Sequence, residues 1–441
     1  MPGKNYSSKV KKIRELLTSI SQKAAEVSQF VQRRSKMGGM VFVQMWVLGC
    51  LQKAGISLAE LSKVSSKLGV TISGPGLDQR IDGEAVKMMQ QVFQACIEQL
   101  SGGSGLAIEL LKHFSAVFIT DSTQIELPAG LQAHFPGSGG KASPAGMKIQ
   151  VLFEFLSGTF RSMEIGASNQ PDQKSDLHLR YSQAGALHLF DLGYFNQCVL
   201  AALANAKAYF ITRLDHQTAL FEAQGEETRI NLLDMLRKST LNQIELHLKI
   251  GRLVHLPVRA LFQRLPPDVA AKRRHKAIAN MKDKGRTPSQ TYLALCEWNM
   301  FITNIPDDWL SFDNILLLYR LRWQIELVFK LWKSQGQLDQ IGPWREERVL
   351  VQLYARLIGL TIFFSLSAPF RWLSDRELSL PKAFASFQAK IPAILRAIHN
   401  GWHAFHAVLM RLFAHWRRFD LKTTRHKHPS TLNLLLGAAP P

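Results

Sequence analysis

The segment Tyr319-Arg-Leu-Arg-Trp-Gln-Ile-Glu-Leu-Val-Phe-Lys-Leu-Trp-Lys333 places four polar side chains at helical spacing. On a helix that turns by about 100° per residue they fall within an arc of roughly 60°; they are Tyr319, Arg322, Glu326 and Lys333. The opposite side carries an apolar stripe, made of Leu321, Ile325, Val328 and Trp332. We therefore predict a helix that packs on a core by one side and presents a carboxylate, two cations and a phenol on the other.

Two interpretations of this polar face follow from its chemistry. Glu326 can hold a divalent cation while Arg322 and Lys333 hold phosphate oxygens. Alternatively, the face is a solvated surface whose charges form salt bridges along the helix. Geometry alone leaves both interpretations open.

The spacing Tyr-x2-Arg-x3-Glu-x6-Lys resembles the YREK signature of the DDE insertion-sequence transposases, in particular the IS-four group that includes the Tn-five type. All four letters match at the family spacing. The resemblance implies that Glu326 is the third member of a metal-binding acidic triad. Two aspartates should then lie upstream.

Two aspartates follow short apolar runs upstream. The run 116–120 is followed directly by Asp121. The run 186–190 is followed by Asp191-Leu-Gly-Tyr-Phe, which is similar to the second-aspartate motif of the family. An aspartate at the end of a buried strand is rigidly held yet faces a cleft. Each aspartate alone is also explained as a cap or turn residue. In order with Glu326, they form the triad that the resemblance implies.

The resemblance implies an α/β fold with a ribonuclease H-like core. Residues 148–155 and 159–165 predict a β-hairpin after the first strand. The 135 residues from Asp191 to Glu326 are too many for one strand–helix connection, so we expect a β-rich insertion there. Its expected strands are 243–248, 256–262 and 291–296, and residues 248–286 carry 11 Lys or Arg against two Asp.

Composition favours a folded protein with a polyanionic partner. The chain has 441 residues, a formal charge of +20 and 46% hydrophobic residues. The two longest uncharged apolar runs, 37–52 and 357–370, are shorter than the ~20 residues of a membrane-spanning helix. Four scattered cysteines without a CxxC pair indicate neither a zinc finger nor a disulfide framework. We therefore expect DNA rather than a membrane as the partner.

The regions flanking the core are predicted to be helical. Ser57-Leu-Ala-Glu60 is typical of a capping box that opens a helix, and short helices around residues 68–70 would resemble a helix-turn-helix. A helical bundle that only supports the core is the alternative. Ser101–Gly105 is a plausible linker, and the glycine-rich segment 130–146 is either a phosphate-approaching loop or a solvent loop.

These patterns divide the chain into five expected regions: 1–100, a helical domain for end recognition; 106–217, the first part of the core; 218–308, the insertion; 309–345, the second part of the core; and 346–441, a helical region for dimerisation and DNA contacts.

The resemblance also implies the chemistry. Asp121, Asp191 and Glu326 would bind two Mg²⁺ ions, with Mn²⁺ as a substitute, and activate water to cut each transposon end. The freed 3′-OH would then attack the opposite strand or target DNA, in a cut-and-paste reaction. Tyr319, Arg322 and Lys333 would hold phosphate. We expect a homodimer on double-stranded DNA, in the bacterial cytoplasm at the nucleoid.

Two alternative functions stay open at this point, and so does the role of Trp298. A nuclease on the same fold would cleave without strand transfer. A domesticated or regulatory DNA-binding protein would not cleave at all. Within the transposase interpretation, Trp298 either stacks on a base flipped out of the DNA, as the resemblance implies for hairpin-forming members, or packs in the sheet core.

Overall fold

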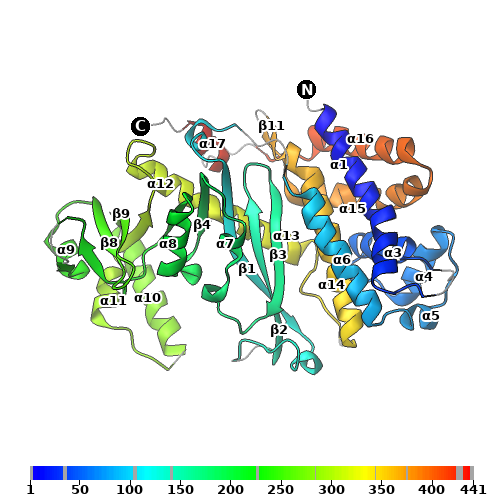
Figure 1. The fold of residues 1–441 in the computed structure, drawn as a ribbon, viewed down its shortest axis with the longest axis horizontal. Coiled ribbons are helices and arrows are strands. Elements are labelled where there is room, and N and C mark those ends of the chain that lie inside the picture. The colour runs from blue at the N-terminus through cyan, green and yellow to red at the C-terminus, as the bar shows by residue number, and fades with distance from the viewer. Residues whose placement is uncertain are drawn as a thin grey trace. The chain divides into compact units, whose positions relative to one another are not determined.

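The computed structural model describes residues 3–32, 37–102, 107–139, 143–224, 228–283, 285–342, 344–373, 376–423 and 431–437 (Figure 1). It is a mixed α/β protein with a large sheet and helical regions. The chain divides into two compact units. The helical unit comprises Met1–Leu106, Ser122–Gln170 and Gln324–Pro429, and the sheet unit comprises Ala107–Asp121, Pro171–Trp323 and Ser430–Pro441.

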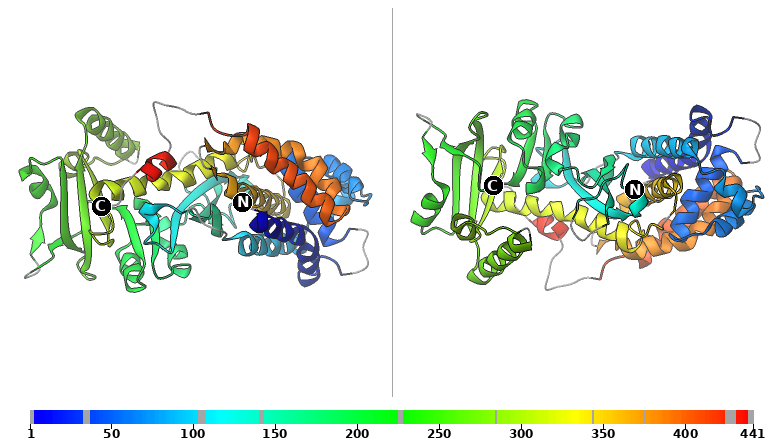
Figure 2. Two further views of the ribbon diagram at one scale, coloured as in Figure 1. Left: turned by 90° about the horizontal axis from the view of Figure 1, so that it is seen from above. Right: turned by 90° about the horizontal axis from the view of Figure 1, so that it is seen from below.

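The helical unit combines segments from both ends of the chain. Its N-terminal helices are α1 (Gly3–Glu15), α2 (Ser21–Val27), α3 (Gly39–Gln52), α4 (Leu58–Lys67), α5 (Gly74–Asp78) and α6 (Gly83–Leu100). Its later helices are α13 (Trp323–Ser334), α14 (Glu346–Ser367), α15 (Leu380–His399) and α16 (Trp402–Phe419). The helices α15 and α16 lie side by side (Figure 2). The strands β2 (Ala145–Glu154) and β3 (Thr159–Ala167) form the predicted hairpin and follow β1 (Ala116–Leu127) in the sheet order.

Helix α14 is the centre of the helical unit. Most of its residues are buried. Together with the following turn, α14 is long and apolar enough to span a membrane if only its length and composition are considered, and its most apolar window has a mean hydropathy of 1.8. In the folded chain 94% of that apolar window is buried inside the protein. The ring of Phe93 on α6 lies 5.6 Å from that of Tyr354, and Leu51 on α3 fills the space beside Gly359. The apolar length of α14 is thus covered by protein.

The N-terminal hundred residues therefore belong to the same compact unit as the C-terminal helices. Sequence patterns predicted a separate helical domain over 1–100, because the glycine- and serine-rich segment after it resembles a linker. The structure instead shows α3 and α6 packed on α14. Residues 103–105 of the expected linker lie outside the described residues, as do residues 140–142 of the glycine-rich segment.

We expect residues 1–100 expressed alone not to fold cooperatively. Without α14, side chains such as Leu51 and Phe93 lose their cover, at a cost of about 1.5–3 kcal/mol for each large apolar side chain. The measurement is thermal unfolding followed by circular dichroism, with the full chain as the reference. A fragment with a sharp, cooperative transition would show that the N-terminal helices are an independent domain.

The expected helix-turn-helix is incomplete in the structure. The capping box of α4 is present, because the Ser57 hydroxyl accepts from the Glu60 backbone N–H and the Glu60 carboxylate accepts from the Ser57 N–H. However, the following helix α5 has only five residues. A recognition helix must lie along the major groove and present several side chains, which one turn cannot do. The alternative of supporting helices agrees better with this geometry.

The sheet unit is built on strands in the order β1-β4-β5-β10-β9-β8-β6-β7. They are the first half of β1, β4 (Ala186–Phe190), β5 (Tyr209–Arg213), β10 (Trp298–Thr303), β9 (Leu256–Arg264), β8 (Gln243–Ile250), β6 (Leu220–Glu222) and β7 (Arg229–Ile230). Its helices are α7 (Leu177–Arg180), α8 (Gln197–Asn205), α9 (Leu232–Lys238), α10 (Pro267–Asp283), α11 (Gln290–Leu295), α12 (Phe312–Tyr319) and α17 (Thr431–Gly437). The strands β1, β4 and β5 run parallel, and β10 runs antiparallel to β5.

The segment between β5 and α12 extends this sheet. Two of its three expected strands are confirmed as β8 and β9, and β9 pairs with β10. The third expected strand, residues 291–296, is wrong, because this stretch forms helix α11. Ser289 caps that helix by accepting from the Tyr292 N–H, so a local capping signal outweighs the strand preference of Thr291 and Tyr292.

Candidate active site

The two aspartates predicted from the sequence lie directly after the last paired residues of the neighbouring strands β1 and β4. The parallel pairing of β1 with β4 ends with Thr120 opposite Phe190, and Asp121 and Asp191 are the next residues. Neighbouring strands are about 4.8 Å apart, and residues in parallel register point to the same face. The backbone therefore brings these two carboxylates together.

The strand that carries Asp121 is longer than expected. Sequence patterns ended it at Thr120, where the apolar run stops. The structure continues β1 to Leu127, with Thr123, Ile125 and Leu127 buried and the residues between them exposed. This alternation is typical of a strand with one covered face, so polar residues do not end it. Asp121 thus sits where the pairing with β4 ends rather than where the strand ends.

Arg322 pairs with Asp121. The guanidinium Nη1 lies 3.0 Å from the Asp121 carboxylate Oδ2, and only 13% and 19% of the two side chains are exposed. A partly buried carboxylate is stabilised in its charged form by such a contact. The contact therefore holds the Asp121 carboxylate in a fixed position.

Tyr319 is buried beside the same charges. Its ring lies 4.8 Å from that of Phe301 in an edge-on arrangement, and only 8% of the residue is exposed. Burial raises the pKa of the Tyr319 phenol, and Asp191 raises it further, while Arg213 and Arg322 act in the opposite direction. The phenol thus stays protonated at neutral pH and can donate a hydrogen bond.

Asp191 is partly engaged by its own loop. Its Oδ1 accepts from the Gly193 N–H at 2.5 Å, which caps the short 3-10 turn Leu192–Tyr194. A carboxylate has further lone pairs, so this cap fixes the orientation of Asp191 and leaves acceptor capacity for a ligand. The cap and the functional interpretation of Asp191 are therefore compatible.

The helix with Glu326 and Lys333 is confirmed with one correction. The segment is not a single helix from Tyr319, because a 3-10 turn at Arg320–Arg322 joins α12 to α13. The angles of a uniform helix therefore do not apply across Arg322. Within α13 the apolar stripe packs as predicted, with Trp332 fully buried and 5.5 Å from the Phe160 ring. Glu326 and Lys333 are half-buried on α13, outside that stripe.

Trp298 lies in the core of the sheet unit. It is 4% exposed and belongs to the apolar cluster that includes Phe262, Leu295 and Ile302. The Arg264 guanidinium covers its ring at 4.7 Å from the centroid, a cation–π contact. In this conformation the Trp298 ring is packed on its neighbours.

Arg213 is the residue of the site that the sequence argument missed. It ends β5, the strand next to β4, and it influences the Tyr319 phenol together with Arg322 and Asp191. The available signal was a cation at the end of the run 208–213, directly after an apolar strand. Its significance depends on β5 lying beside β4, which the sequence did not show.

The donor set is suited to hard divalent cations. Asp121 and Asp191 supply only oxygen ligands, which Mg²⁺ prefers, and Glu326 would add a third carboxylate. Among the described residues, no group of three or more His, Cys, Asp and Glu side chains is gathered closely enough to hold a metal ion by itself. The two aspartates and the paired Arg322 therefore form the part of the site that the sheet unit organises.

Comparisons with known proteins agree with this chemistry. The profile of the transposase DDE domain family matches residues 112–362. The transposase for insertion sequence element IS1151 of Clostridium perfringens is 28% identical, and the alignment covers 96% of each chain. The transposase for IS231F of Bacillus thuringiensis subsp. israelensis is also 28% identical, with 94% of this chain and 91% of the relative covered.

Among solved structures, the piggyBac transposase in a synaptic complex with hairpin DNA aligns with 97% of this chain and 88% of its own. The TM-score is 0.49 and the identity 10%, which is too loose a likeness to support an argument. The family match does not depend on it, because it spans more than half of the sequence. The chain therefore belongs to the DDE transposases of insertion sequences, which are DNA-cleaving enzymes.

Proposed function

We propose that this transposase binds the two ends of its insertion sequence, cuts them by metal-dependent hydrolysis and joins the freed 3′-OH ends to target DNA. The observation that carries the proposal is the placement of Asp121 and Asp191 at the paired ends of β1 and β4, with Arg322 fixed on Asp121. A ribonuclease H-like core, with its acidic residues at one edge of a mixed sheet, is consistent with this placement.

We propose Asp121, Asp191 and Glu326 as the ligands of two Mg²⁺ ions, with Mn²⁺ able to replace them. When bound, such ions activate water and stabilise the leaving oxygen of a phosphodiester. The contact of Arg322 with Asp121 orients that carboxylate before the metal arrives. A pre-oriented ligand reduces the cost of assembling the site.

The other polar residues would hold the DNA strand at the cut. Tyr319, as a neutral phenol, donates to a phosphate oxygen, and Arg322 and Lys333 neutralise its charge. The basic excess of +20 supplies affinity for the rest of the DNA backbone. Because two ends must be cut together, we propose that the active form is a homodimer, in the cytoplasm where the DNA is found.

The proposal is tested with a duplex that carries the terminal repeat flanking the gene. We expect Mg²⁺ or Mn²⁺ to support cleavage at the end of the repeat, and EDTA to stop it. A supercoiled target plasmid added to pre-cut ends with a free 3′-OH should become joined to them. Cleavage without joining would identify a nuclease, and binding without cleavage would identify a regulatory DNA-binding protein.

A further prediction separates the phosphate-holding cations from surface charge. We expect Arg322→Ala and Lys333→Ala each to slow cleavage by at least about tenfold, since each removes a charged hydrogen bond of about 1.5–3 kcal/mol. The matched control is Arg320→Ala, which removes the same charge from an exposed position beside Arg322. Single-turnover rates measure the effect, and wild-type rates in both variants would show that neither cation holds the phosphate at the cut.

A further inference from the structure

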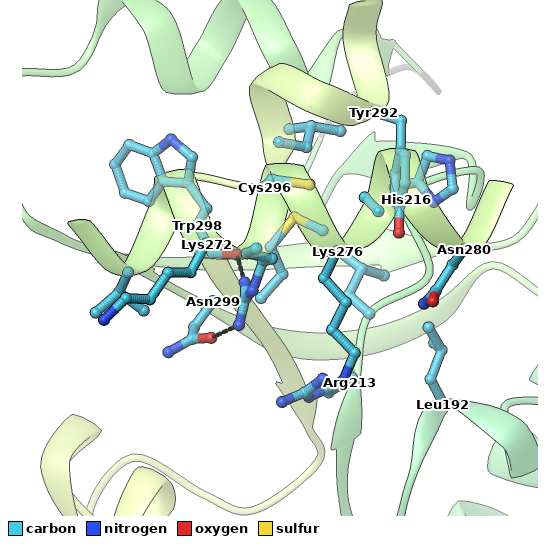
Figure 3. Close-up of a pocket in the computed structure, with 16 residues that line it drawn as sticks. Leu192, Arg213, His216, Lys272, Lys276, Asn280, Tyr292, Cys296, Trp298 and Asn299 are labelled. Carbon is cyan, nitrogen blue, oxygen red and sulfur yellow. Dashed lines mark hydrogen bonds between the residues drawn. The ribbon is translucent and has the colours of Figure 1, made fainter. Parts of the chain in front are cut away.

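A basic pocket opens in the sheet unit between α10, α11 and the ends of β5 and β10 (Figure 3). Its volume is about 540 Å³, within the ~300–1,000 Å³ of ligand sites. Its lining includes the polar residues Arg213, His216, Lys272, Arg273, Lys276 and Asn299. Leu192, the residue after Asp191, belongs to the same wall, so the pocket adjoins the loop that carries a proposed metal ligand.

Two cations in this pocket, Arg213 and Lys276, have neither an acidic nor a hydrogen-bonding partner among the described residues. Arg213 and Lys276 are both exposed, and in Figure 3 the Lys276 chain extends toward Arg213. Within the described part of the chain, neither side chain forms a salt bridge or a side-chain hydrogen bond. Like charges that share a pocket without a counter-charge repel each other, and an anion between them relieves this repulsion.

The neighbouring cations of α10 are engaged elsewhere. Arg273 donates to the Trp298 carbonyl at 2.8 Å and to Asn299 Oδ1 at 2.7 Å, the contacts dashed in Figure 3. Arg274 pairs with Glu297 at 2.8 Å. The carbonyl and amide contacts fix Arg273 in place without neutralising its charge. Lys272, which also lines the pocket, lies 3.9 Å from the Asp268 carboxylate. Among the described cations of the lining, Arg213 and Lys276 are therefore the ones without a carboxylate or hydrogen-bond partner.

The same Arg213 connects the pocket to the proposed active site. It acts electrostatically on the buried Tyr319 phenol, as do Arg322 and Asp191. It also acts on Arg273, whose pKa is lowered by burial first and then by the Arg213 charge. Arg213 therefore lines the same pocket as Lys276 of α10 and Leu192, the residue next to the proposed metal ligand Asp191.

We propose that Arg213 and Lys276 form a phosphate-binding site that positions the DNA backbone beside the cut. This inference rests on the proposed function and adds two positioning residues that the YREK signature does not include. The ligand is a phosphodiester of the bound DNA strand. Apolar residues such as Leu214 and Val269 line the pocket beside these two cations.

The test uses the full chain, the variants Arg213→Gln and Lys276→Gln, and the double variant. The control is Lys282→Gln, which removes an exposed cation of α10 that does not line the pocket. The probe is the terminal-repeat duplex with single uncharged methylphosphonate linkages placed one at a time around the cut. We expect each single variant to cleave about tenfold more slowly and the double variant about a hundredfold more slowly.

The linkage scan separates positioning from folding. One uncharged linkage that slows the wild type should have no further effect in the double variant, because the cations that read that phosphate are gone. In binding assays, a plot of log affinity against log salt concentration should be shallower for the double variant than for the wild type, by about 1 in slope. Lys282→Gln should behave as the wild type in both assays.

Two outcomes would overturn the inference while the proposed function stands. One is wild-type cleavage by the double variant. The other is a double variant that responds to every uncharged linkage as the wild type does, which would assign its defect to structure rather than to a phosphate. A wild-type chain that fails to cleave the unmodified duplex with Mg²⁺ would instead overturn the proposed function on which this inference rests.

Discussion

Replacing Asp121, Asp191 or Glu326 by alanine is expected to abolish cleavage of the transposon end and to spare binding of that end. Each change removes a proposed metal ligand, and we expect a loss of about a thousandfold or more. Affinity comes from the basic surface of a chain with a charge of +20, which these substitutions do not reduce. Removing a carboxylate near DNA phosphates should leave affinity equal or slightly higher.

Asp121 needs a second variant, because its carboxylate also holds Arg322. Alanine at this position leaves a partly buried guanidinium without its acceptor, which can lower stability. Asp121→Asn keeps an oxygen acceptor for Arg322 and removes the negative charge that a divalent cation requires. We expect this variant to unfold near the wild-type temperature and still fail to cleave.

The measurements are cleavage of a labelled end duplex with Mg²⁺ and a mobility-shift titration of the same duplex. The binding assay serves as the control for folding in all variants. Substantial cleavage by any one of the three alanine variants would contradict the assignment of that residue. Loss of binding together with cleavage would mean that the residue supports the structure rather than the metal.

The strands and the buried helix stripe could be predicted from the sequence because their signals are local. An apolar run before Asp191 and the apolar stripe of α13 reflect burial at short sequence separation. The 3-10 turn at Arg320–Arg322 could not be predicted this way, since the polar spacing fits a uniform helix equally well. The identity of the triad came from the resemblance to a family, and the register of β1 with β4 then explained why two of its members lie together.

The features that were missed depend on packing between distant segments. The association of α3 and α6 with α14 joins residues about 300 apart in the chain, and nothing local in the first hundred residues specifies it. Arg213 gains its significance only because β5 lies beside β4 and because α10 brings Lys276 into the same pocket. Charge counting identified the basic stretch 248–286, but it could not separate paired cations such as Arg274 from unpaired ones such as Lys276.

Trp298→Ala is expected to destabilise the protein by about 3–5 kcal/mol, the cost of truncating a fully packed tryptophan. Trp298 is 4% exposed, and the Arg264 guanidinium covers its ring. Such a loss is a large share of the ~5–15 kcal/mol that holds a typical domain folded. Denaturant unfolding of the wild type, Trp298→Ala and Trp298→Phe measures it, with the phenylalanine variant expected to retain most of the stability.

The same variants decide between the two roles of Trp298, packing in the core and stacking on a flipped base. The burial of the Trp298 ring favours the packing role. If packing is its only role, nicking and hairpin formation in Trp298→Ala should decrease together, in proportion to the fraction of protein that is folded. Stacking on a base would first require the ring to leave its apolar neighbours and Arg264, a cost that the ~1–3 kcal/mol of base stacking would have to offset. Assays of nicking and of hairpin formation, run at a temperature where Trp298→Ala is folded, separate the two roles. Persistent nicking with a selective loss of hairpins would contradict the packing role and would show that the ring moves onto the DNA.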